Sequence, residues 1–89
     1  MAMVKYVICG NAMISRETAH DELSRALSLP EYYGRNLDAL WDCVSAMSGE
    51  IVLTGSDEML KNLGLYGKKI LSVFGDAAEQ NPDISFRAE

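Results

Sequence analysis

The sequence predicts an α/β fold, a three-stranded parallel sheet with helices packed against it. Three segments are rich in the β-branched and aromatic residues typical of strands. The long stretches between them have the apolar spacing of helices, with two helices in each connection. Connections of this length rule out hairpins and favour parallel strands with right-handed crossovers. The expected order is β-α-α-β-α-α-β, in a single domain that spans residues 1–89.

The first half of the chain is expected to contain one strand and two helices. The run 4–8, Val-Lys-Tyr-Val-Ile, predicts the strand. Ser15 is a suitable N-cap for a helix that Pro30 stops. A loop, 31–35, leads to Asn36, which is a suitable N-cap for the second helix. The buried stripe expected along this second helix consists of Leu37, Leu40, Trp41 and Val44.

The second half is expected to contain two strands and two helices. Residues 51–53 predict a short strand that is continuously apolar, as expected when both faces of a sheet are covered. Ser56 is expected to cap the third helix, which Gly64 ends. A fourth helix is expected over 66–80, where an Asn-Pro pair follows, and a last strand over 84–86.

The chain is acidic, and its charge is unevenly distributed. Thirteen Asp and Glu against eight Lys and Arg give a net charge of −5. The segment 31–80 holds eight acidic and four basic residues, so most of the negative charge lies in the middle of the chain. A nucleic-acid binder needs cations to replace the counterions on phosphate. The composition therefore argues against nucleic acid and favours a basic partner.

Several other classes are also disfavoured. Two cysteines, Cys9 and Cys43, do not make a disulfide framework, and no Cys/His cluster predicts a metal or a cofactor. We expect Cys43 to act as a small buried hydrophobe. The apolar run near the N-terminus is too short for a signal peptide, and no stretch approaches the length of a membrane span. We therefore expect a cytoplasmic protein that does not bind membranes.

The second predicted helix carries two carboxylates beside its buried stripe. At about 100° per residue, Asp38, Asp42 and Ser45 gather on one face, with Trp41 at the border of the core. Asp38 near the helix N-terminus is stabilised by about 0.3–1 kcal/mol. Asp42 has no cationic neighbour within the helix, and its like-charged spacing from Asp38 costs about 0.2–0.5 kcal/mol. Helix stability does not explain Asp42, which is either a solvated surface acid or a binding residue.

The aromatic residues near this helix have two interpretations. Tyr32 and Tyr33 either anchor the loop to the core or belong to an interface, where Tyr and Trp are enriched. The same alternatives apply to Trp41.

The sequence gives little support for catalysis. It contains no GxSxG, P-loop or HExxH motif. Use of Asp38 and Asp42 as acid and base would need a substrate cleft between them, and a metal would need further ligands nearby. We expect the single histidine, His20, to be structural or at the surface. No residue is expected to be catalytic, and no metal or cofactor is expected.

The run 29–43, LPEYYGRNLDALWDC, resembles the signature of the barstar family of ribonuclease inhibitors. The resemblance implies the parallel-sheet fold and an inhibitor whose loop and second helix enter the active-site cleft of a small basic ribonuclease. By position, Asp42 would replace the RNA phosphate and Asp38 would meet the cationic rim. Tyr32 would stack against the active-site histidine region. The partner-binding residues expected from the resemblance and the helix face are Tyr32, Tyr33, Asn36, Asp38, Trp41, Asp42, Ser45, Ala46 and Asp76.

Three positions depart from the family pattern. Arg35 stands where an acid is expected in the loop, and Met47 stands where the best-known member has a second Trp. Gln80 is neutral where a second acid of the fourth helix is expected. These departures bear on the identity of the partner, and they leave both helix acids in place.

Together these features predict an intracellular, antitoxin-like inhibitor that is not an enzyme. Its expected partner is a basic, extracellular-type bacterial ribonuclease of the barnase type, bound one-to-one, and the free protein is expected to be a monomer. The alternative is a barstar-like interaction domain whose basic partner is not a ribonuclease. A third hypothesis, an enzyme that uses Asp38 and Asp42, would require turnover by the isolated protein.

Overall fold

A computed structural model describes residues 4–89, so the first three residues of the expected domain lie outside the described part. The element order is β-α-α-β-α-α-β, as predicted, with one short 3-10 helix added after the first strand. The bounds of the elements are β1 Lys5–Cys9, η1 Gly10–Ala12, α1 Arg16–Leu27, α2 Leu37–Val44, β2 Gly49–Thr54, α3 Ser56–Leu63, α4 Leu65–Gln80 and β3 Ile84–Ala88.

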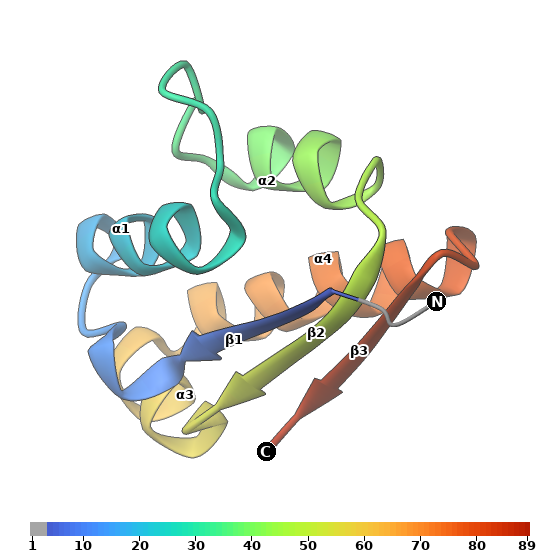
Figure 1. The fold of residues 1–89 in the computed structure, drawn as a ribbon. Coiled ribbons are helices and arrows are strands. Elements are labelled where there is room, and N and C mark those ends of the chain that lie inside the picture. Colours follow the sequence, from blue (N-terminus) through green and yellow to red (C-terminus); the bar gives the residue numbers. More distant parts are fainter. Residues whose placement is uncertain (1–3) are drawn as a thin grey trace.

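The three strands form one parallel sheet in the order β1-β2-β3 (Figure 1). In the middle of the sheet, Val52 of β2 pairs with Val7 of β1 and with Arg87 of β3. Each connection passes through two helices before the chain returns to the sheet. The predicted three-stranded parallel sheet with helices packed against it is therefore confirmed.

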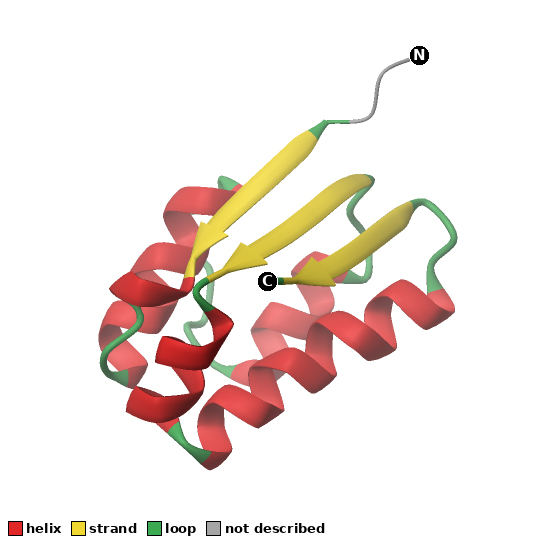
Figure 2. Ribbon diagram, turned by 90° about the horizontal axis from the view of Figure 1, so that it is seen from below, coloured by secondary structure: helices red, strands yellow, loops and turns green. Residues whose placement is uncertain are grey.

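The helices α1 to α4 all lie on one side of the sheet (Figure 2). All three residues of the apolar run 51–53 are nevertheless buried, as the sequence predicts. Ile51 and Leu53 point into the core, and their side chains are fully buried. Val52 points to the other face, yet it is only 2% exposed. Its flanking position between Val7 and Arg87 explains why an apolar residue is tolerated there.

Two helix starts illustrate how local chemistry sets the bounds. Ser15 caps α1 as predicted, in a capping box with Thr18. The expected cap role of Ser56 was wrong, because the helix α3 already begins at that residue. Gly55 holds the cap position with a φ of 64°, where a Cβ would clash with Asn11 Oδ1. The hydroxyl of Ser56 instead donates to the backbone oxygen of Glu89 at 2.9 Å.

The helices α2 and α4 pack against each other, and α2 is tied down at both ends. At its start, Asn36 Oδ1 accepts a hydrogen bond from the backbone N–H of Ala39 at 2.8 Å. At its end, Asn81 Nδ2 donates to the backbone oxygens of Ser45 at 3.0 Å and Met47 at 2.9 Å. These bonds fix a short helix that would be marginal on its own.

Candidate partner-binding surface

The exposed face of α2 carries the two acids that the sequence singled out. Leu40 and Val44 are fully buried on the opposite face, while Asp38 and Asp42 are exposed. Among residues 4–89, no Lys, Arg or His nitrogen lies within 4.0 Å of either carboxylate. Both carboxylates of the free protein are therefore available to a partner. They also repel each other weakly, because they lie four residues apart on one helix.

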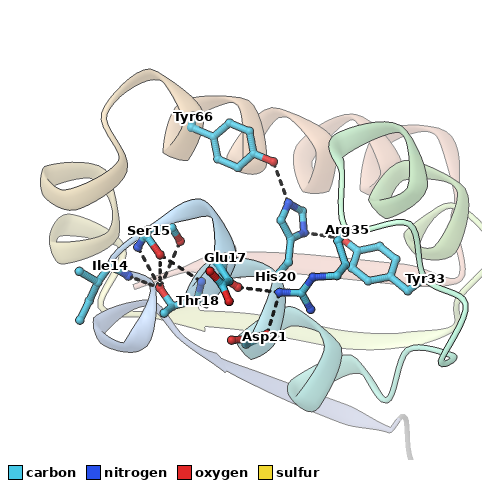
Figure 3. Close-up of polar contacts among 9 residues, drawn as sticks. All are labelled: Ile14, Ser15, Glu17, Thr18, His20, Asp21, Tyr33, Arg35 and Tyr66. Atoms are coloured by element: carbon cyan, nitrogen blue, oxygen red, sulfur yellow. Dashed lines mark hydrogen bonds and ion pairs between the residues drawn. The ribbon is translucent and has the colours of Figure 1, made fainter.

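The two tyrosines of the preceding loop point in different directions. Tyr32 is 89% exposed, whereas Tyr33 is 7% exposed and belongs to the core. The hydroxyl of Tyr33 lies 2.7 Å from Nδ1 of His20 (Figure 3). The other ring nitrogen of His20, Nε2, lies 2.7 Å from the hydroxyl of Tyr66 on α4. Tyr33 thus anchors the loop, and Tyr32 is presented to solvent.

His20 links α1, the loop and α4 through these two hydrogen bonds. Its side chain is buried, and burial is the main reason why its pKa is lowered. The positive charge of Arg35 lowers the pKa further, and Asp21 partly opposes the effect. A neutral imidazole has one N–H donor and one acceptor nitrogen, so one tyrosine donates and the other accepts. The expectation that His20 is structural or at the surface is met by its place in the core.

Arg35 forms a second anchor for the loop. Its guanidinium donates to Asp21 Oδ1 at 2.7 Å and to the backbone oxygen of Glu17 at 2.9 Å (Figure 3). Its backbone φ is 56°, a conformation that few residues other than glycine adopt. The ion pair with Asp21 directs the side chain toward α1. The departure at position 35 therefore fastens the loop before α2 begins.

The remaining predicted residues divide between surface and support. The side chain of Asn36 is occupied by the helix cap and by a bond to the Gly34 oxygen at 3.2 Å. Trp41 is half-buried and packs against the core, which leaves part of its ring accessible. The residues at the end of α2 and on the neighbouring α4 that the sequence also singled out are Ser45, half-buried, and Ala46 and Asp76, both exposed.

A groove opens beside this surface, where the first turns of α1, α2 and α4 meet. Its volume is about 320 Å³. The guanidinium carbon of Arg16 lies 4.3 Å from the centroid of the Tyr66 ring. Sequence reasoning missed this groove because its walls come from three helices that are far apart in the chain. The residues that line it are Arg16, Asn36, Leu37, Asp38, Tyr66 and Lys69.

Glu22 is a buried carboxylate that sequence reasoning also missed. Its Oε2 accepts a hydrogen bond from the backbone N–H of Cys9 at 2.8 Å, which ties α1 to β1. The same oxygen lies 2.6 Å from Arg25 Nη2. The hydrogen bonds from Arg25 lower the pKa of Glu22 most, the Cys9 N–H lowers it further, and burial opposes both. This group supports the helix that carries the anchors of the loop.

The described residues offer little for other chemistry. Within 4–89, no group of three or more His, Cys, Asp or Glu side chains is placed to hold a metal ion. In the same range, no helix is both long and apolar enough to cross a bilayer. Cys9 and Cys43 are free thiols, and Cys43, expected to be a small buried hydrophobe, is half-buried and packs against the core. The exposed acids of α2 and the exposed ring of Tyr32 remain the main features of this surface.

Comparison with known proteins gives two results. The sequence profile of the family described as Barstar (barnase inhibitor) matches residues 3–89. The chain is 38% identical over 84 residues to a protein named "Putative ribonuclease inhibitor YrdF" from Bacillus subtilis (strain 168). That alignment covers 91% of this chain and 92% of the relative. The similarity therefore extends from the run 29–43 to the sheet and the other helices.

Proposed function

Because the chain belongs to the barstar family, whose members are ribonuclease inhibitors rather than enzymes, we propose that it blocks the active site of a barnase-type ribonuclease. The proposed target is a basic, extracellular-type bacterial enzyme. Such an enzyme concentrates positive charge to hold the phosphates of RNA. A partner with a net charge of −5 reaches that surface quickly, because opposite charges steer the encounter.

The observation that carries this proposal is the two carboxylates of α2, which have no ion-pair partner among residues 4–89 and lie on a helix held at both ends. Asn36 and Asn81 fix α2, and Tyr33 and Arg35 fix the loop before it. A rigid display loses little conformational entropy on binding, so more of the interaction energy appears as affinity. Binding to a cationic site gives a reason for two acids on one short helix, although their repulsion slightly lowers the stability of that helix.

Each residue of the surface has a distinct role in the proposed complex. Asp42 occupies the phosphate position and accepts charge-assisted hydrogen bonds from the cationic groups of the enzyme. Asp38 meets the rim of the cleft. Tyr32, with its ring almost fully exposed, stacks on the active-site wall. No bond is made or broken, and inhibition follows from occupation of the substrate site.

The biological setting is part of the same proposal. The inhibitor protects its producer, as an antitoxin does, by binding the ribonuclease one-to-one in the cytoplasm, where RNA is at risk. Two free thiols, at Cys9 and Cys43, suit a reducing compartment. The free protein is proposed to be a monomer, with its acidic face in water until the enzyme arrives.

The test is inhibition of a purified barnase-type ribonuclease at low and moderate salt. The wild type should suppress activity at a near-equimolar ratio. Asp42→Ala should weaken inhibition by about 30-fold or more, because it leaves the cations of the enzyme buried without a partner. The matched control is Asp57→Ala, an exposed acid on α3, which should inhibit like the wild type. Association should slow as salt rises.

Other results would point elsewhere. Equal inhibition by Asp42→Ala and wild type would mean that a residue other than Asp42 occupies the phosphate position. If the folded wild type inhibits none of several basic ribonucleases, the inhibitor proposal fails. The alternative, a basic partner that is not a ribonuclease, would then be sought by pull-down with the wild-type protein, with Asp42→Ala as the control.

A further inference from the structure

We propose that the groove beside Asp38 receives an acidic side chain from the rim of the partner ribonuclease, held by Arg16 and Lys69. This inference rests on the proposed inhibitor function and adds a second, oppositely charged contact to it. The main surface offers carboxylates to cations of the enzyme. The groove offers cations to a carboxylate of the enzyme, so a true partner must match both signs.

The groove is continuous with the proposed interface. Asp38 and the N-cap residue Asn36 form one of its walls, and Arg16 and Lys69 form the others. A partner that covers Asp38 therefore reaches the groove without any change in the orientation of α2. The volume of about 320 Å³ accommodates an Asp or Glu side chain together with water.

The guanidinium of Arg16 is preorganised for such a contact. Its guanidinium stacks on the ring of Tyr66, and the Tyr66 hydroxyl is in turn fixed by His20 at 2.7 Å. Stacking on an aromatic face leaves the edge of a guanidinium free to hold a carboxylate by two parallel hydrogen bonds. The ring thus orders a long, flexible side chain before the partner binds.

The other arginines of the chain contrast with Arg16. Arg25, Arg35 and Arg87 each lie within 4.0 Å of a carboxylate of the same chain. In the part of the chain from residue 4 to the end, neither Arg16 nor Lys69 has such a carboxylate. Arg16 is the first residue of α1, where the helix dipole disfavours positive charge, and its contact with the Tyr66 ring offsets that cost. Lys69 has no ion pair among residues 4–89.

The expected partner is basic, so two cations at the edge of the interface would be expected to repel it. A basic ribonuclease drawn to Asp42 and Asp38 would be repelled by Arg16 and Lys69 at the same rim. The repulsion is absent if the enzyme presents a neutral group at that point, and it becomes an attraction if the enzyme presents an acid. Juxtaposed like charges reject wrong partners, so the groove selects among basic ribonucleases.

The test measures dissociation constants against the ribonuclease that the wild type inhibits best. Arg16→Gln and Lys69→Gln should each weaken binding by about three- to tenfold. The matched control is Lys61→Gln, an exposed lysine on α3 away from the groove, which should change binding less than twofold. Thermal unfolding of each variant establishes that it is folded, and Lys69→Gln does not disturb the stacking of Arg16 on Tyr66.

A second arm uses the enzyme. Neutralising the acid on its rim that faces the groove should weaken binding of the wild type, with no further loss when combined with Lys69→Gln. Unchanged or tighter binding by both groove variants, while Asp42→Ala loses inhibition, would overturn the groove and leave the inhibitor function standing. If the wild type inhibits no ribonuclease, both proposals fall together.

Discussion

The hydroxyl of Tyr33 lies 2.7 Å from Nδ1 of His20, so one of two adjacent tyrosines is fixed in the core while Tyr32 remains 89% exposed. The loop therefore has an inner side that holds it and an outer side that it presents. Because the two roles fall on neighbouring residues, substitutions there can separate stability from binding.

Tyr33→Phe should destabilise the protein, and Tyr32→Ala should not. Loss of the Tyr33 hydroxyl leaves a ring nitrogen of buried His20 without its partner, which costs about 1–3 kcal/mol of unfolding free energy. Removal of the exposed ring should change that free energy by less than about 0.5 kcal/mol and weaken ribonuclease inhibition. Urea unfolding and inhibition assays on both variants provide the measurement. Equal stability of Tyr33→Phe and wild type would contradict the anchoring role.

Stability should depend on pH through His20. The pKa of this histidine is lowered in the folded protein, so the unfolded chain takes up the proton first, near the usual value of about 6.5. The free energy of unfolding should be highest above that pH and should fall as the pH decreases toward the folded pKa. The charged side chains that act on His20 are those of Arg35, which lowers its pKa, and Asp21, which raises it.

The control for this pH dependence is His20→Gln, which cannot take up the proton. Its unfolding free energy should be lower at pH 7.5, yet it should not decline between about pH 6.5 and 5.5. Urea midpoints across this range give the comparison. A decline of equal slope in wild type and variant would assign the pH dependence to another group.

Asp42→Asn should leave the free protein as stable as the wild type or slightly more stable. The substitution removes the repulsion between Asp42 and Asp38, which is worth about 0.2–0.5 kcal/mol. Inhibition should be lost in the same variant. The matched variant Asp38→Asn removes the same repulsion but also the favourable charge at the helix start, so its stability should stay near that of the wild type. A large destabilisation by Asp42→Asn would indicate a structural role for that acid.

The fold and the acidic face could be predicted because both follow from spacing along the chain. The apolar period of each segment marks its type, and the positions 38 and 42 share a face of one helix at any register. The caps at Ser15 and Asn36 were also predictable, since their chemistry is local. Local signals failed at Ser56, because its hydroxyl is used by the distant backbone of Glu89.

The parts that sequence could not give depend on tertiary contacts. The apolar run 51–53 is explained by one helix-covered face and by cross-strand neighbours on the other, a difference that hydropathy alone does not resolve. Arg16 and Lys69 lie 53 positions apart and meet only after α1 and α4 pack. The choice between Tyr32 and Tyr33 as the anchor likewise needed the position of His20.

Substitution of Glu22 should lower stability without changing inhibition, because Glu22 is buried and lies away from the acidic face of α2. Glu22→Gln retains the shape of the side chain but weakens the hydrogen bonds to the Cys9 N–H and to Arg25, so it should cost about 1–3 kcal/mol of unfolding free energy at pH 7. The pKa of Glu22 is lowered in the folded state. Its contribution is therefore full above the unfolded value, near 4.5, and is lost as the pH falls through the folded pKa.

Urea unfolding between pH 3 and 7 tests this assignment. The wild-type curve should converge on that of Glu22→Gln at the acid end, since protonation removes the same charge that the substitution removes. Arg25→Gln should have a smaller effect, because the Arg25 side chain is 65% exposed and water screens its charge. Inhibition by folded Glu22→Gln should match the wild type at neutral pH, because the acids on α2 are unchanged. A constant gap between the two curves at every pH would show that packing, rather than the charge of Glu22, stabilises the contact between α1 and β1.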